Sequence, residues 1–243
     1  ENILNLIRCA WAGSQKYGTL VWSGDIDSSF RSLKNQITAG LGMGLAGIPW
    51  WNTDIGGFGG ADVRDESFKE LLIRWFEFGT FSPVMRLHGY RKPFREPLSD
   101  KGGGKCNSGA DNEIWSYGPE VYEILKSYIE LREKLRPYIR EVMKAAHEKG
   151  TPVMRTLFYE FPEDKYCWKE KDEYFFGPDI LVKPVTDDGI RETSVYLPNG
   201  SEWKNAWTGE EYTGGEKIKV QAPLEKIPLF IRKGSSVAEI FSI

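Results

Sequence analysis

Four polar residues in the first ninety positions each follow or close a short apolar run: Arg8, Asp25, Asp54 and His88. A carboxyl group beside an indole, as the sequence places Asp25 after Trp22, has its ionised form disfavoured and can stay protonated near neutral pH. Such a group suits a proton donor. An imidazole both donates and accepts hydrogen bonds, so His88 can hold hydroxyl groups of a ligand. The pattern predicts a site that combines a proton donor with hydrogen-bonding groups.

Three of these residues also have a structural explanation. Asp25 can cap a following helix, Asp54 lies in a glycine-rich stretch that can form a turn, and His88 can be an ordinary structural histidine. Trp22 and Phe58 can line a pocket, or they can belong to an aromatic core. The residue types alone leave both explanations open.

The segments between these residues are expected to alternate between strands and helices. The expected strands are residues 4–7, 19–22, 45–51 and 82–87, and the expected helices are residues 30–41, capped by Ser28 or Ser29, and residues 67–76. The steps from Asp25 to Asp54 and from Asp54 to His88 are about 30 residues, roughly one βα unit, so we expect successive strands to be parallel. Polar residues at the carboxyl ends of parallel strands gather at one face of a barrel or of a doubly wound sheet. Four strands cannot close a barrel of eight, so a barrel here would lack its first half.

The pattern changes after these units. Residues 91–117 are expected to form a polar loop, and residues 118–149 a long amphipathic helix that Pro137 kinks or divides. Short β-rich runs then alternate with turn residues, at 153–158, 180–185, 193–197 and 229–232. We predict an α/β fold: the C-terminal portion of a (β/α)8 TIM barrel over residues 1–150, followed by an all-β sandwich domain over residues 151–243.

The composition narrows the partners of the chain. A formal net charge of −3 from 32 basic and 35 acidic residues leaves no basic stripe for nucleic acid. No apolar run approaches the roughly 20 residues that cross a bilayer, so no membrane partner is expected. An aromatic share of 14%, with nine Trp, suits the stacking of sugar rings, although an aromatic core would also account for it. The sequence does not determine the localisation of the protein, and a cytoplasmic location is the preferred expectation. The composition is also compatible with a homo-oligomer.

Cofactor motifs are missing from the sequence. The glycine-rich residues 101–105 follow no apolar strand and lead into no helix that opens with Ser or Thr, so they predict a loop and not a phosphate site. Gly59 and Gly60 lack the spacing of a dinucleotide fingerprint. No metal site is expected either, and the widely spaced cysteines predict free thiols. These cysteines are Cys9, Cys106 and Cys167.

Five motifs, in this order and spacing, resemble those of glycoside hydrolase family 31. They are Ala12-Gly13-Ser14-Gln15-Lys16-Tyr17, Trp22-Ser23-Gly24-Asp25, Trp51-Asn52-Thr53-Asp54-Ile55-Gly56-Gly57-Phe58, Ile73-Arg74-Trp75 and Arg86-Leu87-His88-Gly89. Residues 152–234 also resemble the family's proximal C-terminal sandwich. The resemblance therefore covers nearly the whole chain, and it implies a (β/α)8 barrel followed by β-sandwich domains.

The resemblance also implies an activity. Members are retaining α-glycoside hydrolases, and here the expected reaction releases α-linked xylose or glucose from the non-reducing end of an oligosaccharide or small α-glycoside, without a cofactor. Asp25 matches the catalytic acid/base. The residues that match the sugar-binding positions are Arg8, Trp22, Asp54, Phe58 and His88. The family's nucleophilic aspartate belongs to an earlier strand that no segment here resembles, so the upstream half of the barrel would be needed for activity.

Three alternatives stay open at this point. The sugar could be the α-galactose of other members of the same family. The chain could instead be a carbohydrate-binding or structural fragment with no chemistry of its own, as the missing nucleophile would allow. A phosphate-utilising α/β enzyme is the third alternative.

Overall fold

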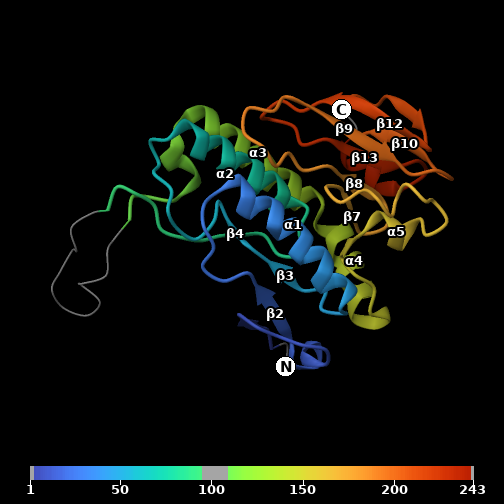
Figure 1. Cartoon of the computed structure of the whole chain (residues 1–243), viewed down its shortest axis with the longest axis horizontal. Helices are drawn as coiled ribbons and strands as arrows, with labels where there is room; N and C mark the ends of the chain where they lie inside the picture. The colour runs from blue at the N-terminus through green and yellow to red at the C-terminus, as the bar shows by residue number, and fades with distance from the viewer. Residues whose placement is uncertain (1–2, 95–108, 242–243) are drawn as a thin grey trace.

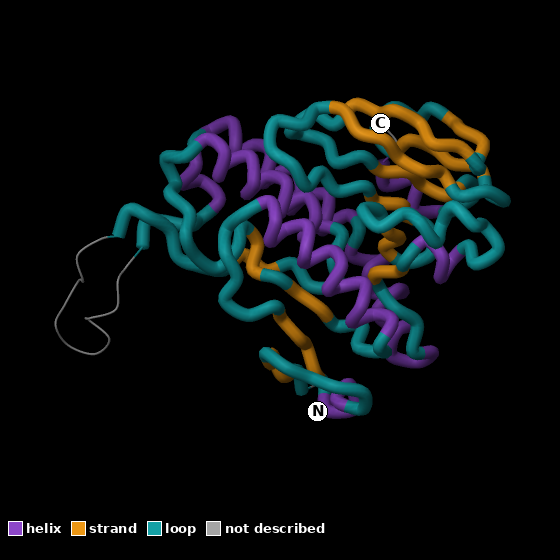
Figure 2. Tube along the Cα trace, in the orientation of Figure 1, coloured by secondary structure: helices purple, strands orange, loops and turns teal. Residues whose placement is uncertain are grey.

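The computed structural model describes residues 3–94 and 109–241, and it packs a half of short strands and long helices against a half made mostly of strands (Figure 1). Figure 2 shows helices gathered over the first half and a layered group of strands near the C-terminus. Residues 101–105 and Cys106, for which a loop and a free thiol are predicted, lie outside the described residues. Cys9 is an exposed free thiol and Cys167 a buried one.

The first half contains two sets of parallel strands. They are β1 (Asn5–Ile7), β2 (Thr19–Trp22) and β3 (Trp51–Asn52), paired in that order, and β4 (Asp54–Ile55) paired with β5 (Arg86–Leu87). The parallel arrangement expected from the spacing is confirmed.

Two of these strands are shorter than predicted. The strand expected over residues 45–51 begins only at Trp51, because the preceding helix extends to Leu45 and Gly47 then takes a left-handed conformation with φ 77°. The strand expected over residues 82–87 is reduced to β5. The Arg132 guanidinium donates to the carbonyl groups of Ser82 and Pro83, so these groups are satisfied by a side chain and not by a strand partner.

The helices follow their sequence signals closely. Helix α1 (Phe30–Leu45) is capped by Ser29, whose hydroxyl accepts from the Ser32 amide, and α2 (Glu66–Thr80) is capped by Asp65. The predicted long helix is divided at Leu135 into two, because Pro137 cannot donate to the preceding turn. These helices are α3 (Pro119–Lys134) and α4 (Arg136–Lys149); short 3₁₀ turns lie at η1 (Ser14–Tyr17), η2 (Ile114–Tyr117) and η3 (Ser236–Phe241). No helix within the described ranges has both the length and the apolar character to cross a bilayer.

The second half is an antiparallel sandwich. Among the described residues, six strands form one sheet, and a two-stranded antiparallel sheet packs on it. The order of the larger sheet is β11 (Glu211–Thr213), β10 (Glu202–Asn205), β13 (Leu229–Arg232), β8 (Ile180–Val182), β7 (Tyr174–Phe176) and β6 (Met154–Arg155), and the smaller sheet pairs β9 (Glu192–Leu197) with β12 (Glu216–Gln221). Val195 and Val220 of the smaller sheet share a core with Trp203 and Phe230 of the larger one. The predicted sandwich is confirmed.

The prediction of one strand in this half is wrong in part. Residues 153–158 were expected to be extended, but β6 ends at Arg155 and a helical turn, α5 (Leu157–Glu160), follows it. The Arg155 guanidinium donates to the Glu160 carboxylate at 2.5 Å and is only 9% exposed. This partly buried ion pair favours a turn that returns the chain toward β6.

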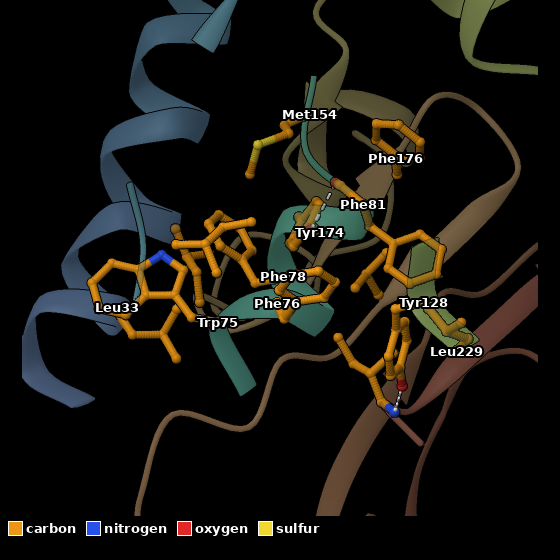
Figure 3. Close-up of a cluster of buried hydrophobic side chains, with 14 of the residues drawn as sticks. Leu33, Trp75, Phe76, Phe78, Phe81, Tyr128, Met154, Tyr174, Phe176 and Leu229 are labelled. Atoms are coloured by element: carbon orange, nitrogen blue, oxygen red, sulfur yellow. Dashed lines mark hydrogen bonds between the residues drawn. The ribbon is translucent and has the colours of Figure 1, made fainter. Parts of the chain in front are cut away.

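The two halves share one hydrophobic core. Trp75 and Phe78 of α2, and Phe81 just after it, lie in the same buried cluster as Tyr174 and Phe176 of the sandwich (Figure 3). The Tyr174 hydroxyl donates to the Phe81 carbonyl at 2.9 Å. The division at residues 1–150 and 151–243 stays a prediction, and it would separate two parts that are packed together.

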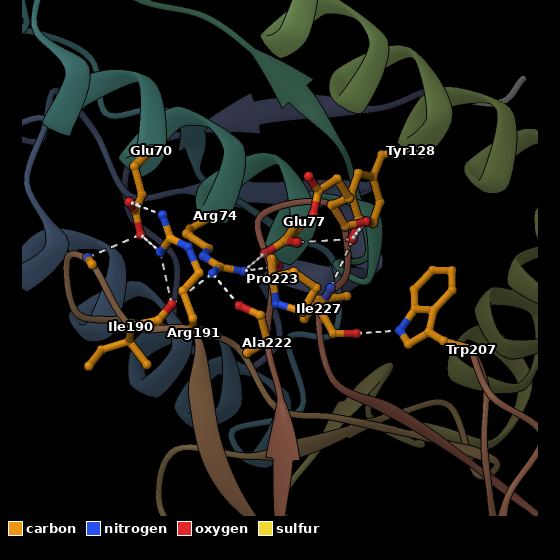
Figure 4. Close-up of polar contacts among 12 residues, drawn as sticks. Glu70, Arg74, Glu77, Tyr128, Ile190, Arg191, Trp207, Ala222, Pro223 and Ile227 are labelled. Carbon is orange, nitrogen blue, oxygen red and sulfur yellow. Dashed lines mark hydrogen bonds and ion pairs between the residues drawn. The ribbon is translucent and has the colours of Figure 1, made fainter.

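Polar contacts reinforce this interface (Figure 4). The Arg74 guanidinium of α2 is fully buried and donates to the carbonyl groups of Ala222, Ile190 and Pro223 at 2.7–3.0 Å. It also pairs with the buried Glu77 carboxylate at 3.2 Å. A positive charge of the barrel half therefore satisfies backbone groups of the sandwich half.

Glu173 provides a test of pH dependence in the sandwich. Its carboxyl is 1% exposed, and burial raises its pKa to about 8. Between an ordinary pKa of 4.5 and this value, the folded chain holds a proton that the unfolded chain has released. Stability should therefore fall as pH rises through this window, by up to ~1.4 kcal/mol per pH unit from this group.

Glu173→Gln should remove that slope, measured by urea denaturation between about pH 5 and pH 8. The exposed Glu163→Gln is the matched control and should keep the slope of the wild type. Equal slopes for Glu173→Gln and wild type would contradict the assignment.

Candidate active site

Three of the predicted site residues, Arg8, Asp25 and His88, lie at or shortly after the carboxyl ends of parallel strands. Arg8 directly follows β1, Asp25 comes shortly after β2, and His88 directly follows β5. Asp54 opens β4, where it lies opposite Arg86. Because these strands are parallel and in register, the structure brings the residues to one edge, as the sequence predicts; their roles stay predictions.

The loop after β2 brings Gly24, the residue before Asp25, against the Arg8 side chain. The Arg8 guanidinium lies 5.7 Å from the centre of the Trp22 ring, and a Cβ atom at Gly24 would lie 3.1 Å from its Nη2. The group over the indole is thus Arg8, whereas Asp25 is exposed. The expected place of the Asp25 carboxyl beside this indole stays a prediction. The capping role is wrong for Asp25, because the α1 cap is Ser29.

Asp54 is the most buried member of the site. It has no exposed surface, and its Oδ1 accepts from the Arg86 guanidinium. Burial raises its pKa, Arg86 and His88 oppose the rise, and the negative charge of Asp25 adds to it. Its Oδ2 atom has no hydrogen-bond partner among the described residues. The electrostatic coupling shows that Asp25, Asp54, Arg86 and His88 lie within one region.

Arg86 is a residue that the sequence reasoning missed. Its side chain is 29% exposed, so at this position the guanidinium reaches the surface while Asp54 stays beneath it. The Asp54 carboxylate pairs with Arg86, and its expected role in lining the pocket stays a prediction. The motif from Arg86 to Gly89 could have pointed to this arginine, but the sequence analysis gave a role only to the histidine of that motif.

Glycines let the neighbouring loops approach closely. A Cβ atom at Gly57 would lie 2.7 Å from the Ser28 backbone, so a larger residue cannot fit between the loops. The Phe58 amide donates to the Ile26 carbonyl at 2.8 Å, and the Phe58 ring lies 5.6 Å from the His88 ring. Phe58 therefore joins the Asp25 loop to the end of β5.

Arg91, to which the sequence analysis also gave no role, fixes the backbone of the site. It is fully buried and donates to the carbonyl groups of Gly57, Tyr90 and Ile55 at 2.9–3.2 Å. Its guanidinium lies 5.0 Å from the centre of the Phe68 ring of α2. A buried charge that is held by several carbonyl groups rigidifies the ends of β4 and β5.

Residues 3–94 and 109–241 contain no group of three or more His, Cys, Asp or Glu side chains placed to hold a metal ion. The chemistry that this edge offers is an exposed carboxyl, Asp25, beside hydrogen-bonding groups and the ring of Phe58. In (β/α)8 barrels and doubly wound sheets, groups at the carboxyl ends of parallel strands are where binding and catalytic sites form.

Comparison with known proteins identifies the family. Residues 1–142 match the model of the glycosyl hydrolases family 31 TIM-barrel domain, and residues 150–237 match that of the glycosyl hydrolase family 31 C-terminal domain. The chain therefore belongs to glycosyl hydrolase family 31.

Relatives resemble the chain over almost its whole length. It is 37% identical to an α-xylosidase of Saccharolobus solfataricus, over 97% of this chain and 30% of that protein. It is 33% identical to α-glucosidase 2 of Bacillus thermoamyloliquefaciens, over 96% of this chain and 27% of that protein. A family 31 α-xylosidase from a soil metagenome, solved with xylose, is 57% identical with a TM-score of 0.95, over 99% of this chain and 36% of that one. The chain thus spans about a third of the length of these relatives.

Proposed function

We propose that this chain supplies the acid/base aspartate and part of the sugar pocket of a retaining α-glycoside hydrolase. The observation that carries the proposal is the gathering of Arg8, Asp25 and His88 at the carboxyl ends of parallel strands in a family 31 barrel. Asp25 is exposed and free to meet a substrate.

In the proposed mechanism Asp25 protonates the departing glycosidic oxygen while a second carboxylate attacks the anomeric carbon. Asp25 then removes a proton from the water that releases the sugar, so two inversions give net retention. The second carboxylate must lie about 5–5.5 Å from the first, on the opposite face of the sugar. Asp54 is buried and paired with Arg86, which leaves this role to a residue outside the chain. Arg8 and His88 donate hydrogen bonds to sugar hydroxyls.

The proposed substrate is an oligosaccharide or small glycoside with an α-linked xylose or glucose at its non-reducing end. The names of the two relatives and the xylose bound to the soil-metagenome enzyme support this pair of sugars. An α-xyloside is the first substrate to test, with α-glucoside and α-galactoside beside it.

The test compares two proteins. The 243-residue chain alone should show no turnover of aryl α-glycosides, because an acid without a nucleophile leaves most of the barrier in place. The natural full-length polypeptide should hydrolyse one of them and release the α-anomer first, as followed by proton NMR. Turnover by the homogeneous short chain, or first release of the β-anomer, would refute the proposal. Sugar binding without turnover by the long polypeptide would instead indicate a non-catalytic role.

A further inference from the structure

A row of aromatic rings leads away from the strand-end site. The His88 and Phe58 rings lie 5.6 Å apart, the Phe58 and Tyr90 rings meet edge to face at 5.4 Å, and the Tyr90 and Phe94 rings stack at 5.7 Å. Tyr90 is 38% exposed and Phe94 is 45% exposed. The row therefore begins at a candidate sugar-binding residue and ends in two partly exposed rings.

Tyr90 is held in place from several sides. Its amide donates to the Phe58 carbonyl at 2.8 Å, and its own carbonyl accepts from the buried Arg91 guanidinium at 3.0 Å. Its ring lies against Gly59, where a Cβ atom would come within 2.6 Å of the ring. Arg91, the next residue, is held as well, because its carbonyl accepts from the Ala110 amide at 2.8 Å. A ring held so firmly at a surface loses little conformational entropy when a ligand stacks on it.

We propose that Tyr90, backed by Phe94, is a specificity-determining residue that binds the leaving-group sugar. This rests on the proposed function. The apolar C–H face of a pyranose ring stacks on aromatic rings, and the tyrosine hydroxyl adds a donor and an acceptor for sugar hydroxyls. The terminal sugar belongs beside Arg8 and His88. The rest of the substrate must continue outward from there, and the ring row extends beyond His88 and Phe58.

The experiment uses the natural full-length polypeptide and two substrates that share the same terminal sugar. One is an α-linked disaccharide, and the other is the α-glycosyl fluoride, which has no leaving-group sugar. Tyr90→Ala should lower kcat/KM for the disaccharide by about tenfold, as expected for the loss of one aromatic stacking contact, and leave the fluoride unchanged. It should also lower the ratio of transglycosylation to hydrolysis when a free sugar acceptor is added. Tyr90→Phe should keep most of the disaccharide rate.

Two further variants separate binding from folding. Gly59→Ala keeps the tyrosine but pushes its ring aside, so it should reproduce the selective loss on the disaccharide. Tyr166→Ala removes a tyrosine that is 60% exposed on the sandwich, and it should change neither substrate. Equal losses on both substrates with Tyr90→Ala, or no loss on either, would overturn the proposal. A wild-type polypeptide that cleaves neither substrate would overturn the proposed function as well, so the two failures are distinguishable.

Discussion

Replacing Asp25 with Ala in the full-length polypeptide should reduce cleavage of substrates with sugar or alkyl leaving groups by roughly 10²- to 10⁴-fold. Such groups depart as strong bases and need a proton, whereas fluoride needs far less protonic help. Glycosyl fluorides should therefore keep most of their rate in the first step. The position of Asp25 supports this expectation, since it is exposed at the end of β2 and is not the cap of α1.

The same variant should respond to azide. The second step loses its base, so water attacks the glycosyl-enzyme slowly, while azide needs no deprotonation and should restore turnover. The product should be the α-glycosyl azide, which NMR identifies. Asp27→Ala is the control, because Asp27 is an exposed carboxyl on the same loop and its loss should leave the preference between fluoride and sugar leaving groups unchanged. If Asp25→Ala loses fluorides and natural substrates equally and azide has no effect, the acid/base assignment is wrong.

Local sequence signals were sufficient to predict most of the helices and strands, and the edge of the parallel strands where the candidate site lies. The cap of α1, expected at Ser28 or Ser29, and the break at Pro137 each depend on residues within one helical turn, and both are predicted from the sequence. The spacing of βα units placed Arg8 and His88 at strand ends, because parallel strands leave little freedom in where those ends lie.

The missed residues depend on contacts between distant segments. Asp54 and Arg86 meet only because β4 and β5 pair in one register, which a single sequence does not specify. Arg91 is charged, so composition favours the surface for it, yet carbonyl groups from two strand ends hold it in the interior. The turn after Arg155 was missed for a similar reason, since its ion pair with Glu160 overrides β propensity.

The interface between the halves depends on such a contact at Arg74. This guanidinium has no exposed surface, and it meets three sandwich carbonyl groups as well as Glu77. Burial raises the pKa of Glu77 to about 7, against the attraction of Arg74 and a hydrogen bond from Tyr128. Removal of Arg74 would leave a buried carboxylate and three carbonyl groups without their donor.

Arg74→Met should therefore lower the free energy of unfolding by roughly 3–5 kcal/mol, the range for a buried ion pair that loses one partner. Urea denaturation followed by tryptophan fluorescence measures it. Arg64→Met is the control, because Arg64 pairs with Asp62 at the surface and its loss should leave the free energy of unfolding nearly unchanged.

The pH dependence separates charge from packing. In Arg74→Met the Glu77 carboxyl can avoid a buried charge by taking up a proton, which is easier at low pH. The loss of stability should therefore be smaller near pH 5 than near pH 8, whereas a pure packing defect would cost the same at both. The double variant Arg74→Met, Glu77→Leu removes the stranded charge and should recover part of the loss, but not all, because the carbonyl groups of Ile190, Ala222 and Pro223 remain without a donor. A loss below about 1 kcal/mol in Arg74→Met, typical of a surface ion pair, would show that Arg74 does not hold the two halves together.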